Sequence, residues 1–243
     1  MLEIKNLTKR YGNTTALSEI NLTFAPGEIV GLFGENGAGK TTLFQCILNF
    51  IPFTGEITLN GEKITHKNIA GISYGSSNNT FFSQLSVSEN KYFYAMSFPL
   101  FNESRFDMLA DFFELPINKP TKDLSLGQKN QVETILALSQ GATYILLDES
   151  FVNNDTFKRE DFYKVLLGLL SPDECLVLAS HLIEELKTFV SRVVLLRKGN
   201  ILADKATEEL DQAGLEIIDW MKQLYGYENR AAMFIEKMES DPV

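Results

Sequence analysis

Cysteine and histidine are scarce in this 243-residue chain, which has two of each. Cys46 and Cys175 both lie inside apolar stretches, so we expect two reduced thiols in the core rather than a disulfide. His66 and His181 belong to no Cys/His cluster with the spacing of metal ligands. The composition therefore argues against a small secreted domain held by disulfides and against a zinc centre.

Long apolar runs and an excess of positive charge are missing too. The run at 165–170 is far too short to span a bilayer, and residues 1–5 carry no signal-peptide pattern. We therefore expect the chain to stay in the cytoplasm unless a partner holds it elsewhere. The net charge of −10 argues against a nucleic-acid partner, because affinity for a phosphate backbone depends on clustered Lys and Arg.

The most informative stretch runs from Gly34 to Thr42 and reads GENGAGKTT, which satisfies the pattern G-x-x-x-x-G-K-[ST]. Residues 28–33 before it are typical of a short buried strand, and residues 42–50 after it are typical of a helix with one apolar face. A glycine-rich loop between a strand and a helix is the context that such a pattern needs. The stretch therefore predicts a site for nucleotide phosphates.

The residue types in this loop suit that chemistry. Gly34, Gly37 and Gly39 let the backbone curl and direct its N–H groups inward, and the helix N-terminus adds partial positive charge. Lys40 supplies a point charge for the β- and γ-phosphates, and the Thr41 hydroxyl can ligate Mg²⁺. We expect the nucleotide to contact Gly34, Glu35, Asn36, Gly37, Ala38, Gly39, Lys40, Thr41 and Thr42.

The rest of the chain predicts an α/β fold around this loop. We expect a P-loop core with an N-terminal antiparallel β subdomain and an inserted α-helical subdomain at about 86–140. The core domain would cover 1–204, and a short helical extension would follow at 205–243. The expected elements are antiparallel strands within 2–33, a hairpin at 55–64, buried strands at 143–149 and 174–180, a helix at 157–170 and a closing hairpin at 192–202.

Ionisable residues are expected at the ends of the buried strands. Asp148 and Glu149 close one strand, His181 follows another, and Lys40 comes soon after a third. Ligands of parallel α/β sheets bind at the carboxyl ends of the strands. There Asp148 can anchor Mg²⁺ through water, Glu149 can polarise an attacking water, and His181 can hydrogen-bond that water or the γ-phosphate.

A second signal, LSLGQK at 124–129, opens a helix upstream of Asp148. Ser125 is a good N-cap, and Gly127 leaves backbone N–H groups uncovered for an anion. Together with the P-loop and the Asp148–Glu149 pair, this stretch resembles the signature loop of the ABC-transporter ATPase family. The resemblance covers residues 1–204 in family order and at family spacing.

The resemblance implies ATP and Mg²⁺ as cofactors, and ATP hydrolysis as the activity. It implies a transmembrane permease and a second ATPase subunit as partners, with the chain at the cytoplasmic face of the cell membrane. Tyr11 matches the aromatic residue that stacks on adenine, and Asp155 matches the aspartate of the family's D-loop. Family subunits pair head to tail, so Ser125 and Gly127 should serve the partner's nucleotide, and Gln128 is grouped with them as nucleotide-binding.

The sequence departs from the family pattern at several positions. Ser77 stands where the Q-loop glutamine is expected, and Gln84 lies too far along to replace it. Gln131 replaces a frequent arginine, and residues 150–155 differ from the common D-loop. Leu126 stands where most members have glycine, a variant seen among drug and peptide exporters, so we predict export of a peptide or antibiotic-like substrate.

Two other functions remain open at this point. One is a soluble ABC-type ATPase switch in translation or DNA maintenance; a single cassette, no heptads and the negative charge argue against it. The other is a degenerate nucleotide-binding subunit of a heterodimer, which the intact Glu149 argues against.

Overall fold

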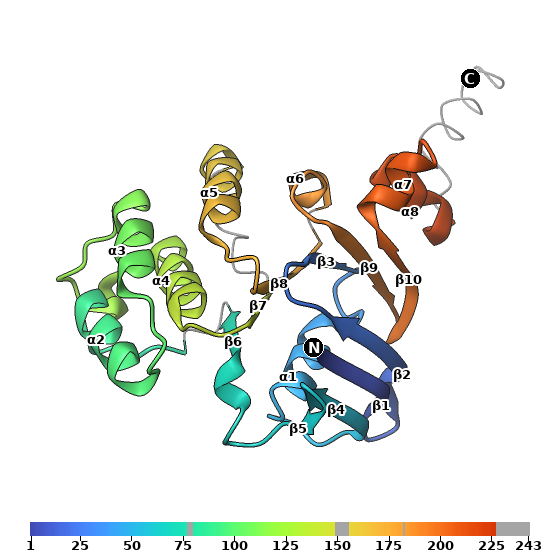
Figure 1. Ribbon diagram of the computed structural model, residues 1–243, viewed down its shortest axis with the longest axis horizontal. Helices are drawn as coiled ribbons and strands as arrows, with labels where there is room; N and C mark the ends of the chain where they lie inside the picture. Colours follow the sequence, from blue (N-terminus) through green and yellow to red (C-terminus); the bar gives the residue numbers. More distant parts are fainter. Residues whose placement is uncertain (77–79, 149–155, 182, 227–243) are drawn as a thin grey trace, which may run out of the picture.

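The computed structural model describes residues 1–76, 80–148, 156–181 and 183–226 (Figure 1). Two sheets and a group of helices make up this part of the chain. The antiparallel sheet has the order β2-β1-β4-β5, and the larger sheet has the order β10-β9-β3-β8-β7-β6. This arrangement confirms the predicted α/β fold with an antiparallel subdomain and a helical part.

The antiparallel sheet contains β1 (Leu2–Tyr11), β2 (Thr14–Phe24), β4 (Thr54–Leu59) and β5 (Glu62–Lys63). The β4–β5 hairpin turns at Asn60 and Gly61, both with positive φ, as the Asn-Gly pair predicts. Tyr11, which we expected in a loop, is instead the last residue of β1 and pairs with Thr14. The pairing of β1 with β2 shifts register after Ile4. These irregularities let the strand continue to Tyr11 although its buried and exposed residues do not alternate strictly.

The larger sheet has a parallel centre. Its strands are β3 (Ile29–Phe33), β6 (Ile72–Ser76), β7 (Tyr144–Asp148), β8 (Cys175–Ser180), β9 (Arg192–Arg197) and β10 (Asn200–Ala206). All neighbouring pairs are parallel except β9 with β10, which form the predicted closing hairpin. The edge strand β6 was not predicted.

Alternate residues of β7 face two different hydrophobic clusters. Ile145 and Leu147 join the cluster that holds α4 (Leu126–Ser139) and the C-terminal helices, whereas Tyr144 and Leu146 join the cluster that holds α1 (Lys40–Ile47). Both faces of the parallel sheet are therefore covered, which explains why this strand is apolar at every position before Asp148.

The helical subdomain consists of α2 (Val87–Ser97), α3 (Glu103–Phe112) and α4 (Leu126–Ser139), which lie together on one side of the molecule (Figure 1). Arg105 fastens it to the core. Its guanidinium donates to both carboxylate oxygens of Glu174, at 2.7 and 2.9 Å, and to the carbonyls of Leu138 and Leu169. A buried, bidentate ion pair thus connects α3 to the segment before β8.

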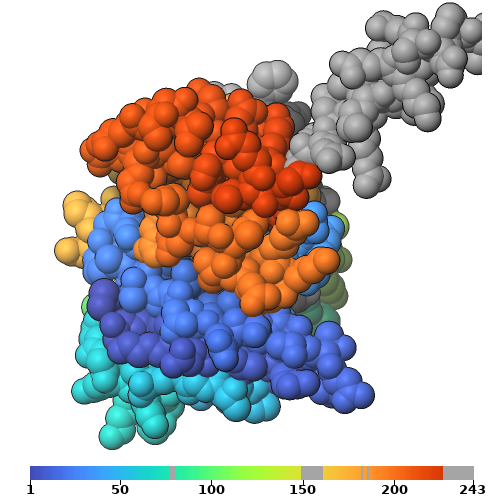
Figure 2. Space-filling view, turned by 90° about the vertical axis from the view of Figure 1, so that its right-hand side faces the viewer, coloured from blue at the N-terminus to red at the C-terminus, as the bar shows by residue number. Residues whose placement is uncertain are grey.

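The remaining helices are α5 (Thr156–Leu169), α6 (Ile183–Leu186), α7 (Thr207–Gln212) and α8 (Ile217–Tyr225). Leu210, Ile217 and Met221 are buried in the same cluster as Val193 and Leu195 of β9. The C-terminal helices therefore pack against the core, and Figure 2 shows them next to β9 and β10 on one face of the molecule. Within the described ranges, no helix is long and apolar enough to cross a membrane.

Both cysteines are buried, free thiols, as predicted. Burial raises the pKa of Cys46 to about 11 and that of Cys175 to about 12. The reactive thiolate is therefore scarce at neutral pH. In the folded protein at pH 8, we expect iodoacetamide to alkylate each cysteine in less than about a tenth of the molecules. Full alkylation in denaturant is the control, and rapid labelling of the native protein would contradict the buried placement.

Candidate nucleotide site

The predicted phosphate loop joins the end of β3 to the start of α1. Gly39 caps the helix with a φ of 115°, and Gly37 has a φ of 80°, a region that residues with a Cβ rarely adopt. Helix α1 begins at Lys40, two residues before the predicted start, and carries no acidic residue in its first turn. The partial positive charge of this helix end is therefore available to an anion.

Two glycines let the loop lie directly against neighbouring backbone. A Cβ on Gly34 would collide with the Leu196 carbonyl of β9, and one on Gly39 would come within 2.9 Å of the Ala16 carbonyl of β2. The loop is also tied to the β9–β10 turn, because the Gly199 N–H donates to the Ala38 carbonyl at 3.0 Å. Strands from both sheets therefore hold the loop in shape.

Lys40 bends back over this loop. Its Nζ donates to the Gly34 carbonyl at 2.8 Å and lies 3.4 Å from the Glu35 carbonyl, and the side chain is 5% exposed. The loop carbonyls thus hold the ammonium group beside the N–H groups of the helix start. This is the placement that a lysine needs to meet the phosphates of a nucleotide.

The carboxyl ends of three neighbouring strands finish level with one another. Phe33 of β3 pairs with Ser180 of β8, and Asp148 of β7 pairs with Ala179 of β8. The phosphate loop, Asp148 and His181 therefore meet at one edge of the sheet, as predicted. His181 follows β8 directly and is exposed. Glu149, Asp155 and Ser77 lie outside the described residues.

Tyr74 is a neighbour of Asp148 that the sequence did not reveal. Its hydroxyl donates to Oδ2 of Asp148 at 3.3 Å, and the Asp148 side chain is buried. Burial, and then the Asp148 charge, raise the pKa of Tyr74 well above its usual value. The phenol therefore stays protonated and remains a donor that orients this carboxylate.

Tyr11 lies at the turn between β1 and β2. It pairs with Thr14, two residues before Ala16, whose carbonyl oxygen faces Gly39. The ring is about half exposed, and the Lys9 ammonium lies 4.6 Å from its centroid. The same ammonium donates to the Pro52 carbonyl at 2.7 Å, so the ring lies near the residues that follow α1, and its role in stacking on a base stays a prediction.

The LSLGQK stretch forms the N-terminus of α4. Ser125 is the N-cap and accepts a bond from the Gln128 N–H at 3.2 Å, while the Gln128 side chain accepts from the Ser125 N–H at 3.1 Å. Gln128, which we expected at the nucleotide, therefore closes a capping box in this structure. Gln84 accepts from Lys122 at the surface, and Leu126 is exposed.

The comparisons with known proteins agree with this geometry. The model of the family described as ABC transporter matches residues 17–152, more than half of the chain. The chain belongs to the ABC transporter family. Its predicted identity as an ATP-binding ATPase domain of that family is confirmed.

Several curated relatives of this ABC transporter domain carry names of import systems. "Phosphonates import ATP-binding protein PhnC" of Wolinella succinogenes is 32% identical over 94% of this chain and 89% of that protein. "Xylose import ATP-binding protein XylG" of Histophilus somni is 29% identical over 87% of this chain, which spans 45% of that protein's length. "ABC transporter ATP-binding protein YtrB" of Bacillus subtilis is 27% identical over 89% of this chain and 76% of that protein.

Solved structures show the same fold. "Structure of ATP binding subunit of ABC transporter" superimposes with a TM-score of 0.80 at 22% identity, covering 93% of this chain and 98% of that one. A dimeric cassette, MJ0796 bound to ADP and Pi, gives a TM-score of 0.74 at 23% identity over 85% of this chain and 99% of that one. The names of the relatives give no support to the predicted exporter-like type.

The ABC transporter domain has donors that fit Mg²⁺. Thr41 is the second residue of α1, and Asp148 ends β7, two strands away from β3 in the sheet order. Hydroxyl and carboxylate oxygens are the ligands that this hard cation takes, usually with substrate phosphates and water completing the shell. Among the described residues, no group of three or more His, Cys, Asp or Glu could hold a metal alone.

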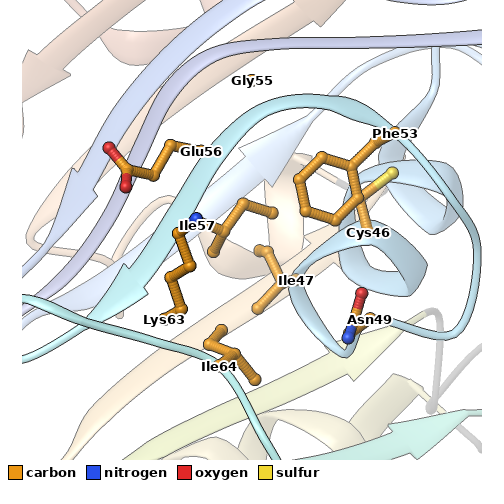
Figure 3. Close-up of a pocket in the computed structure, with 9 residues that line it drawn as sticks. All are labelled: Cys46, Ile47, Asn49, Phe53, Gly55, Glu56, Ile57, Lys63 and Ile64. Carbon is orange, nitrogen blue, oxygen red and sulfur yellow. The ribbon is translucent and has the colours of Figure 1, made fainter.

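A separate hollow lies at the other end of α1 (Figure 3). Cys46, Ile47 and Ile57 line it together with the more exposed Glu56 and Lys63, and its volume is about 340 Å³. Cys46 is six residues beyond Lys40, or about 9 Å along the helix axis. This hollow is therefore distinct from the phosphate loop, and it has none of the predicted site residues in its lining.

Sequence reasoning missed a contact between the C-terminal helix α8 and the end of β9. The Arg197 guanidinium lies 5.1 Å from the ring centroid of Tyr225 and donates to its carbonyl at 3.4 Å. Burial, and then the charge of Glu35, raise the pKa of Tyr225. The end of α8 is therefore near enough to Glu35 of the phosphate loop to feel its charge, and no local sequence pattern predicts this.

Proposed function

We propose that this chain binds MgATP at the 34–42 loop and hydrolyses it to power transport through a separate permease. The observation that carries the proposal is the shared edge of β3, β8 and β7, where the Lys40 loop, His181 and Asp148 meet. The relatives named as ATP-binding proteins of transport systems support it.

The chemistry divides among few residues. Lys40 neutralises charge on the β- and γ-phosphates, and Thr41 and Asp148 hold Mg²⁺, which offsets further phosphate charge. Glu149 accepts a proton from water as the water oxygen attacks the γ-phosphorus, and His181 hydrogen-bonds the γ-phosphate or that water. The bond to the β–γ bridging oxygen breaks, and ADP and phosphate leave.

A second subunit completes each nucleotide site in this proposal. Helix α4 and its signature loop lie with the helical subdomain, well away from α1 (Figure 1). Ser125 and Gly127 of one subunit, with Gln128 beside them, then serve the nucleotide on the loop of the other. The dimeric cassette with ADP and Pi supports pairing of this kind. Closure of the dimer is driven by ATP contacts made from both sides.

The permease partner places the chain at the cytoplasmic face of the cell membrane. Large apolar side chains on α2 and the turn after it, namely Tyr92, Phe93, Met96 and Leu100, are exposed. Apolar patches of this kind are commonly covered by a partner protein. We assign this surface to contact with the permease.

The direction of transport does not follow from the proposed ATPase activity. Export of a peptide or antibiotic-like substrate was predicted mainly from Leu126, whereas several relatives are named as importers of xylose, ribose or phosphonates. We therefore propose ATP-driven transport without assigning its direction or substrate. Uptake and efflux assays with the chain and its co-purified permease decide between the two.

The test of the proposed function uses the full chain. We expect calorimetry to show MgATP binding, and a phosphate-release assay to show turnover that EDTA abolishes. We also expect a polytopic membrane protein to co-purify with the chain. Absence of ATP binding would overturn the proposal, and recovery with ribosomes or DNA would favour the soluble switch.

A further inference from the structure

Glu133 is a buried acid in the middle of α4, the helix that carries the signature loop. Only 2% of its surface is exposed, and the residues around it on the helix, from Asn130 to Ala137, are buried as well. Its carboxylate accepts from the Thr80 N–H at 2.8 Å, from the Thr80 hydroxyl at 2.5 Å and from the Ser76 N–H. A carboxylate inside a protein is costly unless donors surround it, and here three donors do so.

These donors come from both sides of one short segment. Ser76 ends β6 and Thr80 follows residues 77–79, which lie outside the described residues. Ser76 is also the register partner of Asp148 on β7. The Glu133 carboxylate therefore connects the signature helix to the strand beside the predicted magnesium ligand.

The packing around this connection is close. A Cβ on Gly75 would lie 2.9 Å from Leu147 and 3.2 Å from Ala137, so α4 rests directly on β6 and β7. Tyr94 of α2 also lies close to Thr80. Thr80 is thus bonded to α4 and adjacent to α2, two helices of the helical subdomain.

We propose that Glu133 is a positioning residue for ATP hydrolysis, which sets the signature loop relative to the Asp148 edge of the same subunit. Ser125 is eight residues away from Glu133, about 12 Å along a rigid helix, so a rotation of α4 at Glu133 displaces the loop. The inference rests on the proposed function, because the signature loop acts on the partner's nucleotide. Glu133 touches neither nucleotide, so its loss should affect turnover rather than binding of ATP to one subunit.

The experiment compares Glu133→Gln and Thr80→Val with wild type and with Thr80→Ser. Glutamine keeps the shape but loses the charge and offers one acceptor oxygen, while valine removes the hydroxyl donor. We expect kcat to fall about tenfold in both variants, with the Kd for MgATP unchanged within about twofold. Thr80→Ser keeps the hydroxyl and should behave as wild type. Glu103→Gln is the matched control, because its exposed carboxylate pairs with Lys91.

Hydrogen exchange provides a readout that is independent of nucleotide. The Thr80 amide should exchange about tenfold faster in Glu133→Gln than in wild type, with other α4 amides unchanged. Wild-type kcat in both Glu133→Gln and Thr80→Val would overturn the proposal. A fall of kcat together with ATP affinity and Tm would also overturn it, since a general packing defect gives that result. If wild type failed to hydrolyse ATP, the proposed function would be wrong, and so would a role of Glu133 in turnover. Faster exchange of the Thr80 amide in Glu133→Gln would still show the hydrogen bond between Thr80 and Glu133.

Discussion

Replacement of Lys40 by methionine is expected to weaken MgATP binding by about 100-fold. The ammonium group is held 2.8 Å from the Gly34 carbonyl, at the start of a helix with no acidic residue in its first turn. Methionine has a similar length but no charge, so the phosphates lose charge-assisted hydrogen bonds of about 1.5–3 kcal/mol each. Calorimetry with MgATP measures the change in Kd directly.

Lys63→Met is the matched control for this prediction. Lys63 lies on β5 and lines the hollow at the opposite end of α1 from Lys40. We expect this variant to bind MgATP as wild type does. If Lys63→Met lost affinity while Lys40→Met kept it, the nucleotide site would have been assigned to the wrong end of the helix.

Glu149→Gln is expected to lower kcat by about 1000-fold while MgATP binding is retained. The amide cannot accept the proton of the attacking water, whereas the phosphate loop and Lys40 are untouched by the change. ATP then stays bound between subunits, so size-exclusion chromatography with light scattering should show a dimer that wild type forms only transiently. Phosphate release under saturating MgATP measures kcat.

Glu184→Gln provides a matched control for the glutamate variant. Glu184 lies on α6 and pairs with Lys187 at the surface. Its loss should leave both turnover and oligomeric state unchanged. Normal turnover in Glu149→Gln would remove Glu149 from the role of base, and loss of ATP binding would indicate a role in holding the nucleotide.

The phosphate loop was predictable because its chemistry is local. A glycine pattern, one lysine and the flanking apolar stretches lie within consecutive residues, and the structure places the Lys40 loop between β3 and α1 as expected. The strand ending in Asp148 was predictable for a similar reason. A strand covered on both faces is apolar at successive positions, so its single carboxylate marks its end.

Strand β6 could not be predicted in the same way. Its sequence, ISYGS, contains two serines and a glycine, which are poor signals for a strand. Gly75 is needed because Leu147 and Ala137 approach its backbone, and Ser76 faces Glu133. These requirements come from segments far away in the sequence.

Glu133 and Tyr74 were missed for a related reason. Nothing beside Glu133 in the chain indicates that Thr80 will meet it, and Tyr74 reaches Asp148 across 74 positions. The Asp148 contact exists only once β6 and β7 are paired. Sequence patterns therefore predicted the residues expected to contact phosphate or Mg²⁺. The residues that position them, Tyr74 and Glu133, became visible only from tertiary packing.

The contact of the phosphate loop with the β9–β10 turn has a consequence for the order of folding. The Gly199 N–H bonds Ala38, and the Leu196 carbonyl lies against Gly34, so residues near 200 form one wall of a loop made near residue 40. During synthesis the loop emerges early, yet it lacks these contacts until the residues near 200 have left the ribosome. A nascent chain halted before residue 196 should therefore fail to retain ATP, and we expect this subunit to bind its nucleotide only after the β9–β10 turn has formed.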